Sequence, residues 1–279
     1  MGNAAKKPRA RWALPAALVT MGLLWAGNFT LELTELDAPS RRLPAGFDGF
    51  RIALLTDLHG RSFGKDNDWL VEALAEAKPE LIALAGDIAD ETSDLQELAG
   101  LLAHLTAIAP CCYVTGNHEW RMENRAQWFR LLRSCGVRRL ENEFVTLTRG
   151  GDTIVLAGVD DPNGPRDQKT PETLLDEIHE AQPGAYTIVL CHRNDQLERM
   201  AALHADLVLS GHAHGGVVRL PVVGAVFGTH YEFFPSYTAG LYPCGDTSLV
   251  VSRGLGGSRR LPVRIGNRPE IPIITLRRG

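Results

Sequence analysis

The stretch FRIALLTDLH spans residues 50–59 and decides how the chain begins to fold. Its first six residues are almost entirely apolar, which is typical of a strand buried inside a sheet. Two polar side chains, Asp57 and His59, follow that run directly. The stretch therefore predicts a buried strand that delivers a carboxylate and an imidazole at its carboxyl end.

Asp57 is the first of three residues spaced 30 positions apart, the others being Asp87 and Asn117. Each follows a short apolar run, and residues 67–78 and 95–109 between the runs carry apolar side chains at helical spacing. That spacing is about the length of one βαβ unit. Because parallel strands joined by right-handed crossovers end at one edge of a sheet, we expect these side chains to converge.

The rest of the chain continues in alternating elements. The sequence predicts a helix at 123–135, a hairpin at 144–160, a helix at 171–181, and strands at 186–190 and 206–209. The last two strands precede His192 and the motif Gly211-His212-Ala-His214. Residues 217–276 are rich in Val, Gly and Pro, and we expect them to form a β-rich return that completes a second sheet.

Composition places the chain among globular proteins. It has 279 residues, of which 44% are hydrophobic and 22% charged, with a net charge of −4. No lysine-rich arm or basic aromatic stripe occurs, so nucleic acid is not an expected partner. The five cysteines form no C-x-x-C motif and are expected to be structural thiols.

The amino terminus has the composition of a membrane segment. Four basic residues, at positions 6, 7, 9 and 11, precede residues 12–31, which carry no charge. Twenty such residues are about enough to cross a bilayer, and the basic flank should remain cytoplasmic. We therefore expect a basic flank and transmembrane anchor, or a cleaved signal segment, at 1–31. A linker or first edge strand follows at 32–48 and the main domain at 49–279. The protein would be a single-pass cell-membrane protein with its main domain on the extracytoplasmic side.

The polar side chains at the strand ends are the ligands that divalent metals prefer. Taken singly, Asp57 reads as a turn residue, Asp87 as a helix N-cap and His192 as a packed core histidine. Together they point to two adjacent metal ions, which Mn, Fe or Zn could supply, and such pairs serve phosphoester chemistry. The candidate metal ligands are Asp57, His59, Asp87, Asn117, His192, His212 and His214.

The motifs resemble those of the calcineurin-like metallophosphoesterase superfamily. The matching pieces, in order, are D-x-H at 57–59, G-D at 86–87, G-N-H-E at 116–119, H at 192 and G-H-x-H at 211–214. The carboxyl-terminal half resembles the membrane-anchored bacterial branch of that superfamily, of the YkuE and YaeI type. The matching residues there are Gly240-Leu-Tyr242, Ser252 to Gly256, Arg264 and Arg268-Pro-Glu270.

The resemblance implies an α/β fold in which two mixed sheets form a four-layer α-β-β-α sandwich. It assigns Asp57, His59, Asp87 and His214 to one metal, and Asp87, Asn117, His192 and His212 to the other. It also implies that His118 is the catalytic acid near the leaving group, and that a hydroxide shared by the metals attacks phosphorus. The expected activity is that of a phosphodiesterase or pyrophosphatase. A non-catalytic metal-binding module on the same fold is the alternative.

Further residues carry secondary expectations. Arg193 or Arg253 could hold the substrate phosphate, and Glu119 is expected to support the site. Asp160-Asp161 could be a pair of catalytic carboxylates, but a turn is the favoured interpretation. Among the remaining histidines, His230 is the best candidate for a role at the site. The apolar residues 220–227 read as strand and core. They could instead accept the tail of a lipid-linked substrate such as UDP-2,3-diacylglucosamine. The sequence does not indicate an oligomeric state.

Overall fold

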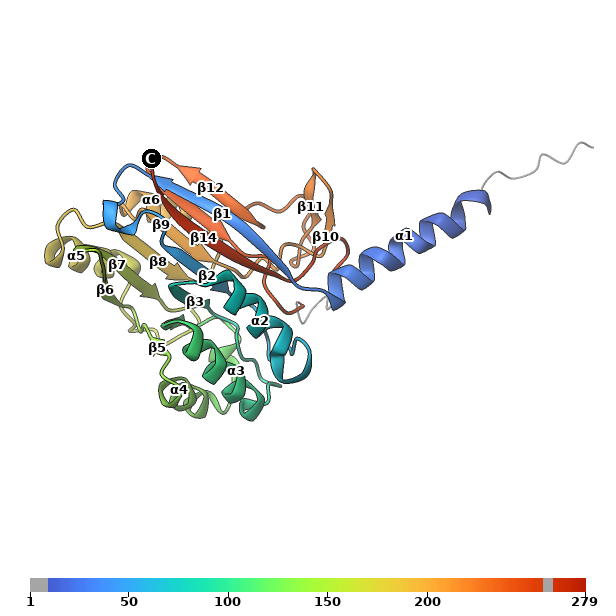
Figure 1. Ribbon diagram of the computed structural model, residues 1–279, viewed down its shortest axis with the longest axis horizontal. Coiled ribbons are helices and arrows are strands. Elements are labelled where there is room, and N and C mark those ends of the chain that lie inside the picture. Colours follow the sequence, from blue (N-terminus) through green and yellow to red (C-terminus); the bar gives the residue numbers. More distant parts are fainter. Residues whose placement is uncertain (1–9, 258–262) are drawn as a thin grey trace, which may run out of the picture.

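The computed structural model describes residues 10–257 and 263–279 and contains two six-stranded mixed sheets (Figure 1). Both sheets contain parallel and antiparallel neighbours, which confirms the expected α/β class. The first sheet has, in spatial order, β1 (Glu32–Ser40), β14 (Glu270–Arg278), β2 (Arg51–Leu55), β3 (Leu81–Ala85), β4 (Cys111–Val114) and β5 (Arg138–Arg139).

The second sheet faces the first. Its strands, in spatial order, are β12 (Gly240–Cys244), β13 (Thr247–Val251), β9 (Leu207–Ser210), β8 (Thr187–Cys191), β7 (Asp152–Val159) and β6 (Glu143–Arg149). A separate two-stranded ribbon consists of β10 (Val218–Leu220) and β11 (Gly224–Phe227). The expected return of the chain into the second sheet is thus confirmed for β12 and β13. It is wrong for β10 and β11, which form the separate ribbon, and for β14, which enters the first sheet between β1 and β2.

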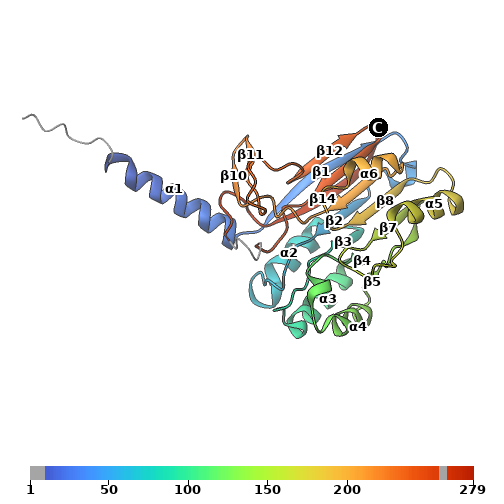
Figure 2. The ribbon, with the colours of Figure 1, turned by 180° about the vertical axis from the view of Figure 1, so that it is seen from behind.

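Three layers of apolar contact hold the sheets and helices together. Successive residues of a strand point to opposite faces, so Ile52 and Leu54 of β2 pack between the two sheets, whereas Ala53 and Leu55 pack under helices. The helices over the first sheet are α2 (Asp68–Ala77), α3 (Leu95–Ile108) and α4 (Arg125–Ser134). Over the second sheet lie α5 (Pro171–Ala181) and α6 (Leu197–Ala202) (Figure 2). The arrangement is the expected α-β-β-α sandwich.

Short 3-10 helices complete the described connections. They are η1 (Ala45–Phe47), η2 (Lys65–Asn67) and η3 (Glu119–Arg121). Residues 32–40 form β1 at the edge of the first sheet, paired in parallel with β14 from Glu32 opposite Glu270 to Ser40 opposite Arg278. Of the two expectations for this segment, an edge strand is what the first part of it forms.

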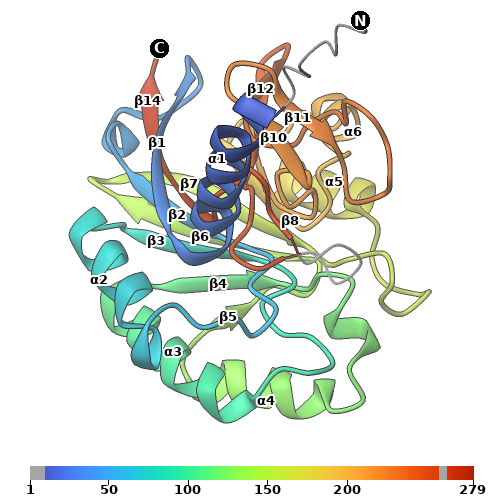
Figure 3. The ribbon, with the colours of Figure 1, turned by 90° about the vertical axis from the view of Figure 1, so that its right-hand side faces the viewer.

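The amino-terminal helix α1 (Ala10–Phe29) projects from the sandwich beside β10 and β11 (Figure 3). Its last turns contact the rest of the molecule, where the side-chain amide of Asn28 donates to the carbonyl oxygen of Arg264 at 3.1 Å. In the part of the chain that the structure describes, no helix has both the length and the apolarity to cross a membrane. The expected anchor is therefore not confirmed, and Lys6, Lys7 and Arg9 lie outside the described residues.

Candidate metal centre

The predicted ligands lie in loops at the carboxyl ends of five strands, three from the first sheet and two from the second. β2 precedes Asp57 and His59, β3 precedes Asp87, β4 precedes Asn117 and His118, β8 precedes His192, and β9 precedes His212 and His214. The convergence predicted from the 30-residue spacing is therefore confirmed, and it extends across both sheets.

These loops adopt backbone conformations that side-chain-bearing residues seldom take. Five of the candidate ligands have positive φ, namely Asp57 (52°), His59 (51°), Asp87 (51°), His212 (66°) and His214 (49°). Positive φ is uncommon outside glycine, and such strain concentrates at functional sites. The sandwich thus holds these side chains in conformations that an unconstrained loop would not favour.

The glycines of the motifs permit the loops to approach one another. A Cβ added to Gly116 would lie 2.2 Å from Oδ1 of Asp87. One added to Gly211 would lie 2.4 Å from Oδ2 of Asp57. Both contacts are far too close for a side chain, so each glycine is required by the packing of a neighbouring carboxylate.

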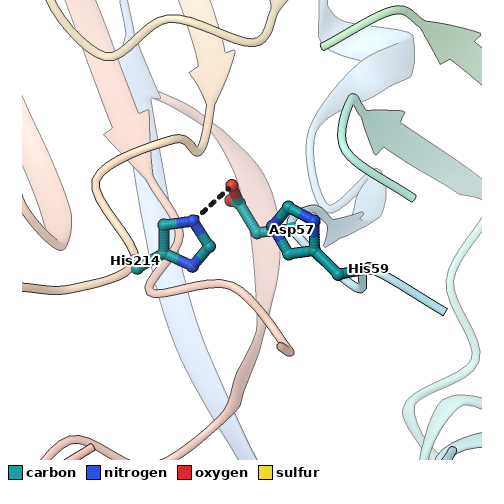
Figure 4. A group of neighbouring side chains, drawn as sticks. All are labelled: Asp57, His59 and His214. Atoms are coloured by element: carbon teal, nitrogen blue, oxygen red, sulfur yellow. Dashed lines mark ion pairs between the residues drawn. The ribbon is translucent and has the colours of Figure 1, made fainter. Parts of the chain in front are cut away.

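One group of possible ligands consists of Asp57, His59 and His214 (Figure 4). Nε2 of His214 lies 3.4 Å from Oδ1 of Asp57, and the rings of His59 and His214 are stacked with centroids 5.2 Å apart. Within each group, one candidate ligand atom per residue lies within 4.8 Å of the others. This is the residue set that the sequence motifs assign to the first metal, except for Asp87.

Asp87 connects the remaining groups. It forms one group with His192 and His212, and another with His59 and His118. Oδ2 of Asp87 lies 3.2 Å from Nε2 of His192 and 3.9 Å from Nε2 of His59. A single carboxylate oxygen therefore faces histidines of both predicted shells, as a bridging ligand must.

Buried polar atoms without a hydrogen-bond partner show that the site fits a bound cation. Burying a polar atom without a partner is unfavourable, so such atoms are uncommon in folded proteins. Five of them gather here, namely Oδ1 of Asp57, both ring nitrogens of His59, Oδ1 of Asn117 and Nδ1 of His214. All are oxygen or imidazole nitrogen atoms, which suit Mn, Fe or Zn.

Three of the four candidate histidine ligands have a lowered pKa, which favours the neutral form that binds metals. Burial lowers the pKa of His59 and of His214, the latter to about 4, and holds that of His212 well below its usual range. These imidazoles are therefore neutral at neutral pH, the form that binds metals. His192 differs: burial alone would lower its pKa, but Asp87 outweighs this and raises it to about 10. His192 must release that proton before Nε2 can bind a cation.

Buried hydrogen bonds fix the orientation of the ligands. Nδ1 of His192 lies 2.8 Å from the carbonyl oxygen of Ala85, so Nδ1 carries the proton and Nε2 turns to Asp87. Oδ2 of Asp57 accepts from the Thr56 hydroxyl at 2.7 Å and from the backbone N–H of His212 at 2.9 Å. Both contacts leave Oδ1 of Asp57 free to face His214.

Glu119 binds the backbone of the two loops that follow β3 and β4. Its fully buried carboxylate accepts backbone N–H groups from Asp87, Ile88, Ala89 and Gly116 at 2.8 to 3.3 Å. Burial and the nearby Asp87 charge raise the pKa of Glu119 to about 8, and bonds from the Gly116 and Asp87 amides oppose this. The expectation that Glu119 supports the site rather than facing it agrees with this position.

A polar cavity of about 290 Å³ opens above these groups. Its walls include Asp87, Asn117, His118, Arg121, Asn163, Arg193, His212, His214, Thr229 and His230. Nδ1 of His118 lies 3.0 Å from Oε2 of Glu91 at the cavity edge. His230 lines the cavity too, with its ring centroid 5.9 Å from that of His212.

The two arginines proposed to hold phosphate differ in position. Arg193 reaches the cavity: its Nη1 lies 3.1 Å from Nε2 of His212, while Nε and Nη2 bind the carboxylate of Asp161 at 2.6 and 3.1 Å. Arg253 does not line the cavity and is instead paired with Glu270 at 3.0 Å and Glu32 at 2.9 Å.

Several residues orient the side chains of the site in ways that the sequence does not indicate. For Asp161 the sequence favours a turn over a catalytic carboxylate. Asp161 does accept the N–H of Asn163 in a turn, but it is also buried and orients Arg193. Asp90 lies 3.7 Å from Nδ1 of His59, and Thr56 orients Asp57. An aspartate after a strand has no signal that separates such a role from a turn, so these residues could not have been found from one sequence.

Comparisons with known proteins agree with the motifs. The sequence model of the calcineurin-like phosphoesterase family matches residues 50–216, more than half of the chain. The metallophosphoesterase YkuE of Bacillus subtilis is 32% identical over 255 residues, which cover 88% of this chain and 86% of that protein. The phosphodiesterase YaeI of Escherichia coli is 29% identical over 234 residues, covering 81% of this chain and 82% of YaeI.

A protein of Bos taurus named transmembrane protein with metallophosphoesterase domain is also similar. It is 30% identical over 285 residues, which cover 98% of this chain and 63% of the bovine protein. This chain thus spans less than two thirds of that relative. The family match and the similarity to YkuE lead to one conclusion: the chain belongs to the calcineurin-like phosphoesterase family and is a phosphoester hydrolase.

Proposed function

We propose that the protein is a dinuclear metal-dependent hydrolase of phosphodiesters or pyrophosphates. The observation that carries this proposal is the position of Asp87, whose carboxylate belongs to two of the three ligand groups. Two cations close together repel each other, and a shared carboxylate reduces that repulsion. Asp57, His59, Asp87 and His214 would hold one cation, and Asp87, Asn117, His192 and His212 the other.

When bound, the two cations would acidify a water molecule and offset negative charge on the phosphoryl group. The chain's own residues would do the remaining work. Arg193 would bind a phosphoryl oxygen, since its guanidinium is held at the cavity by Asp161. His118 would donate a proton to the departing oxygen, and Glu91, 3.0 Å from its Nδ1, orients the ring.

We further propose a lipid-linked substrate, for which UDP-2,3-diacylglucosamine is one example. The support is an apolar wall next to the cavity. Thr229 and His230 line the cavity, and Phe227, two residues before Thr229, packs its ring against Phe233 with centroids 5.4 Å apart. An acyl chain placed against this wall would bury apolar surface while the phosphoester reached the metal centre.

We also propose attachment to the cell membrane, with the catalytic domain on the extracytoplasmic side. The basic residues before an uncharged stretch at 12–31 support this orientation, and the name of the bovine relative is in keeping with it.

The central test combines metal analysis with an assay. The full chain should bind two metal ions per molecule and hydrolyse bis-p-nitrophenyl phosphate. Asp87→Asn should lower kcat/KM by roughly a hundredfold or more. Asp176→Asn, an exposed change on α5, is the matched control and should behave like the parent. Two bound metals without hydrolysis of any phosphoester would instead indicate the non-catalytic module.

The lipid proposal has its own test, because Phe227→Ser removes the centre of the apolar wall. The change should raise KM for a lipid-linked phosphoester and leave the rate on bis-p-nitrophenyl phosphate unchanged. Equal relative rates on the two substrates before and after the change would exclude a lipid-binding role for Phe227.

A further inference from the structure

The β10–β11 ribbon exposes large apolar side chains that the sandwich does not cover. They are Leu220, Val222, Val223, Tyr231, Phe233 and Phe234, each at least 46% exposed. The backbone joins them into one surface: Phe227 of β11 bridges to Phe233, and the N–H of Phe234 donates to the carbonyl oxygen of Val226 at 3.2 Å. We call this set the apolar ribbon surface. Exposed apolar clusters of this kind mark interaction sites.

The backbone at the tip of the ribbon is strained. The N–H of Val223 donates to the carbonyl oxygen of Pro221 at 2.8 Å, and Val222 between them has a φ of 68°. A γ-turn with positive φ at its centre is rare and strained, and β-branched residues are the least suited to it. Val222 is nevertheless fully exposed and gains no buried contact in return. A valine at this position therefore indicates a role outside folding.

The ribbon and α1 are attached to the same segment of chain. Val218 of β10 bridges to Ile265, and the N–H of Arg219 donates to the carbonyl oxygen of Ile265 at 2.9 Å. One residue earlier, the carbonyl oxygen of Arg264 would lie 2.3 Å from a Cβ added to Gly27, so α1 packs closely here. The ribbon and the base of α1 accordingly lie side by side in Figures 1 and 3.

The surface of α1 indicates what covers this region. Residues 17–22 are exposed on every side of the helix, and no charge occurs between residues 12 and 31. A protein partner would cover one face of such a helix and leave a polar face to water. A helix that is apolar all round suits a lipid environment or a protein core. Since α1 stands outside the core, lipid is the environment that fits it.

The same ribbon forms part of the cavity wall. β10 begins at Val218, four residues after His214, and Thr229 and His230 of the cavity come two and three residues after the end of β11. The ribbon therefore leaves the metal centre, turns at Val222 and returns to the centre.

The ribbon and α1 share one segment of chain, α1 has the surface of a helix in lipid, and the ribbon forms part of the cavity wall. From these three observations we infer that the apolar ribbon surface inserts into the interfacial layer of a lipid bilayer beside α1. The ribbon would then hold the mouth of the metal cavity at the membrane surface, where a phosphoester carried by a lipid is reached without leaving the bilayer. Val222 and Val223 would be the most deeply inserted side chains. The membrane contact rests on the proposed membrane attachment but not on the proposed hydrolysis, on which only its benefit to catalysis rests.

The test introduces tryptophan at the tip of the full chain by Val222→Trp. The protein is reconstituted into phosphatidylcholine–phosphatidylglycerol vesicles that contain brominated phosphatidylcholine, which quenches tryptophan at short range. The matched control is Gln127→Trp, an exposed position on α4. The bromolipid should quench the added fluorescence of Val222→Trp and leave that of Gln127→Trp unquenched. Equal quenching in the two variants overturns the proposal. So does a blue shift of Val222→Trp emission that rises with protein concentration in the absence of lipid, because it would assign the surface to a second copy of the chain.

A second arm measures the benefit to catalysis with two substrates that share one reacting group. They are methyl 4-methylumbelliferyl phosphate in solution and hexadecyl 4-methylumbelliferyl phosphate in vesicles. The double change Val222→Asn with Val223→Asp suits the turn, because Asn and Asp tolerate positive φ better than valine does. It should raise KM for the hexadecyl substrate about tenfold and leave the methyl substrate unchanged. An unchanged KM for both substrates overturns the catalytic benefit. Failure of the parent protein to cleave the methyl substrate contradicts the proposed function instead, and the quenching result stands independently of it.

Discussion

Oδ2 of Asp87 lies 3.2 Å from Nε2 of His192, and both side chains are almost completely buried. Burial alone would raise the pKa of Asp87, but His192 opposes this and holds that pKa well below its usual range. The two side chains form an ion pair across the interface of the two sheets, with β3 before one and β8 before the other. An ion pair in this position keeps the carboxylate charged and ready for a cation.

We predict that His192→Ala removes one of the two metals. The bound metal should fall from two ions to about one per chain, and kcat/KM should fall by roughly a hundredfold or more. Metal analysis of the purified protein, together with an assay on bis-p-nitrophenyl phosphate, measures both effects. His179→Ala on α5 is a control, because its ring contacts His204 and lies outside the three ligand groups. Retention of two metals by His192→Ala would contradict the assignment of His192.

We predict that Glu119→Gln weakens metal binding without removing any ligand. The carboxylate accepts hydrogen bonds from four backbone N–H groups, two at each oxygen. In glutamine an NH2 group replaces one oxygen, and this donor would face two backbone N–H donors. Each buried N–H left without a partner costs about 1–3 kcal/mol, so the free energy of unfolding should fall by at least that amount. Metal affinity should fall by about 10–100-fold.

A titration of activity against metal concentration, with and without the change at Glu119, measures the affinity. Excess metal should restore most of the activity, because all ligands remain. Glu123→Gln is the control, since Glu123 is exposed. An unchanged titration curve for Glu119→Gln would show that the bonds to Asp87 and Gly116 do not position the ligands.

We predict that Arg193→Ala impairs substrate binding and leaves the metals in place. Nη1 of Arg193 can donate to Nε2 of His212 only while that nitrogen is unprotonated. When Nε2 carries the proton, Nη1 is available to a phosphoryl oxygen, while Asp161 still holds the other guanidinium nitrogens. A hydrogen bond to a charged group is worth about 1.5–3 kcal/mol, so KM should rise by roughly 10–100-fold.

The measurement is KM and bound metal for Arg193→Ala beside Arg199→Ala. Arg199 lies in α6 near the same loop, but its guanidinium is turned to Glu172 at 2.7 Å. The control should keep the parent KM. Loss of metal in Arg193→Ala would mean that Arg193 supports His212 rather than the substrate.

The strand-end side chains were predictable because two simple patterns coincide. Apolar runs of four or five residues, such as 81–85 and 111–114, indicate buried strands, and the residue after such a run must lie at a sheet edge. The constant spacing of Asp57, Asp87 and Asn117 then placed three of these edges together. Both patterns are local in the sequence, so one chain was enough to read them.

The carboxyl-terminal strands were harder because their partners are remote in the sequence. β14 pairs in parallel with β1 and antiparallel with β2, so its place depends on strands more than 200 residues away. Its residues 270–276 are buried on both faces and show no alternation that would reveal the sheet they join. The supporting carboxylates Asp90 and Asp161 were missed for a related reason, because their partners come from other loops.

We predict that His118→Gln affects substrates according to their leaving group. Nδ1 of His118 is bound to Glu91, which leaves Nε2 as the nitrogen that can reach a departing oxygen. An alkoxide departs slowly without a proton, so kcat for an alkyl phosphodiester should fall by about 10²–10⁴-fold. p-Nitrophenolate departs readily as an anion, so the loss on bis-p-nitrophenyl phosphate should be far smaller.

The comparison requires both substrates and a count of bound metal, because the ring of His118 lies 4.9 Å from that of His59. His104→Gln, an exposed change on α3, controls for the loss of an imidazole elsewhere. Unchanged metal content with a selective loss on the alkyl substrate would assign proton donation to His118. An equal loss on both substrates would mean that His118 acts before the leaving group departs, by positioning the substrate or the ligands. The backbone N–H of His118 donates to Oδ1 of Asp87 at 2.8 Å, and the change to glutamine keeps that contact. A uniform loss is therefore not expected from the backbone, and only the imidazole accounts for a loss that depends on the leaving group.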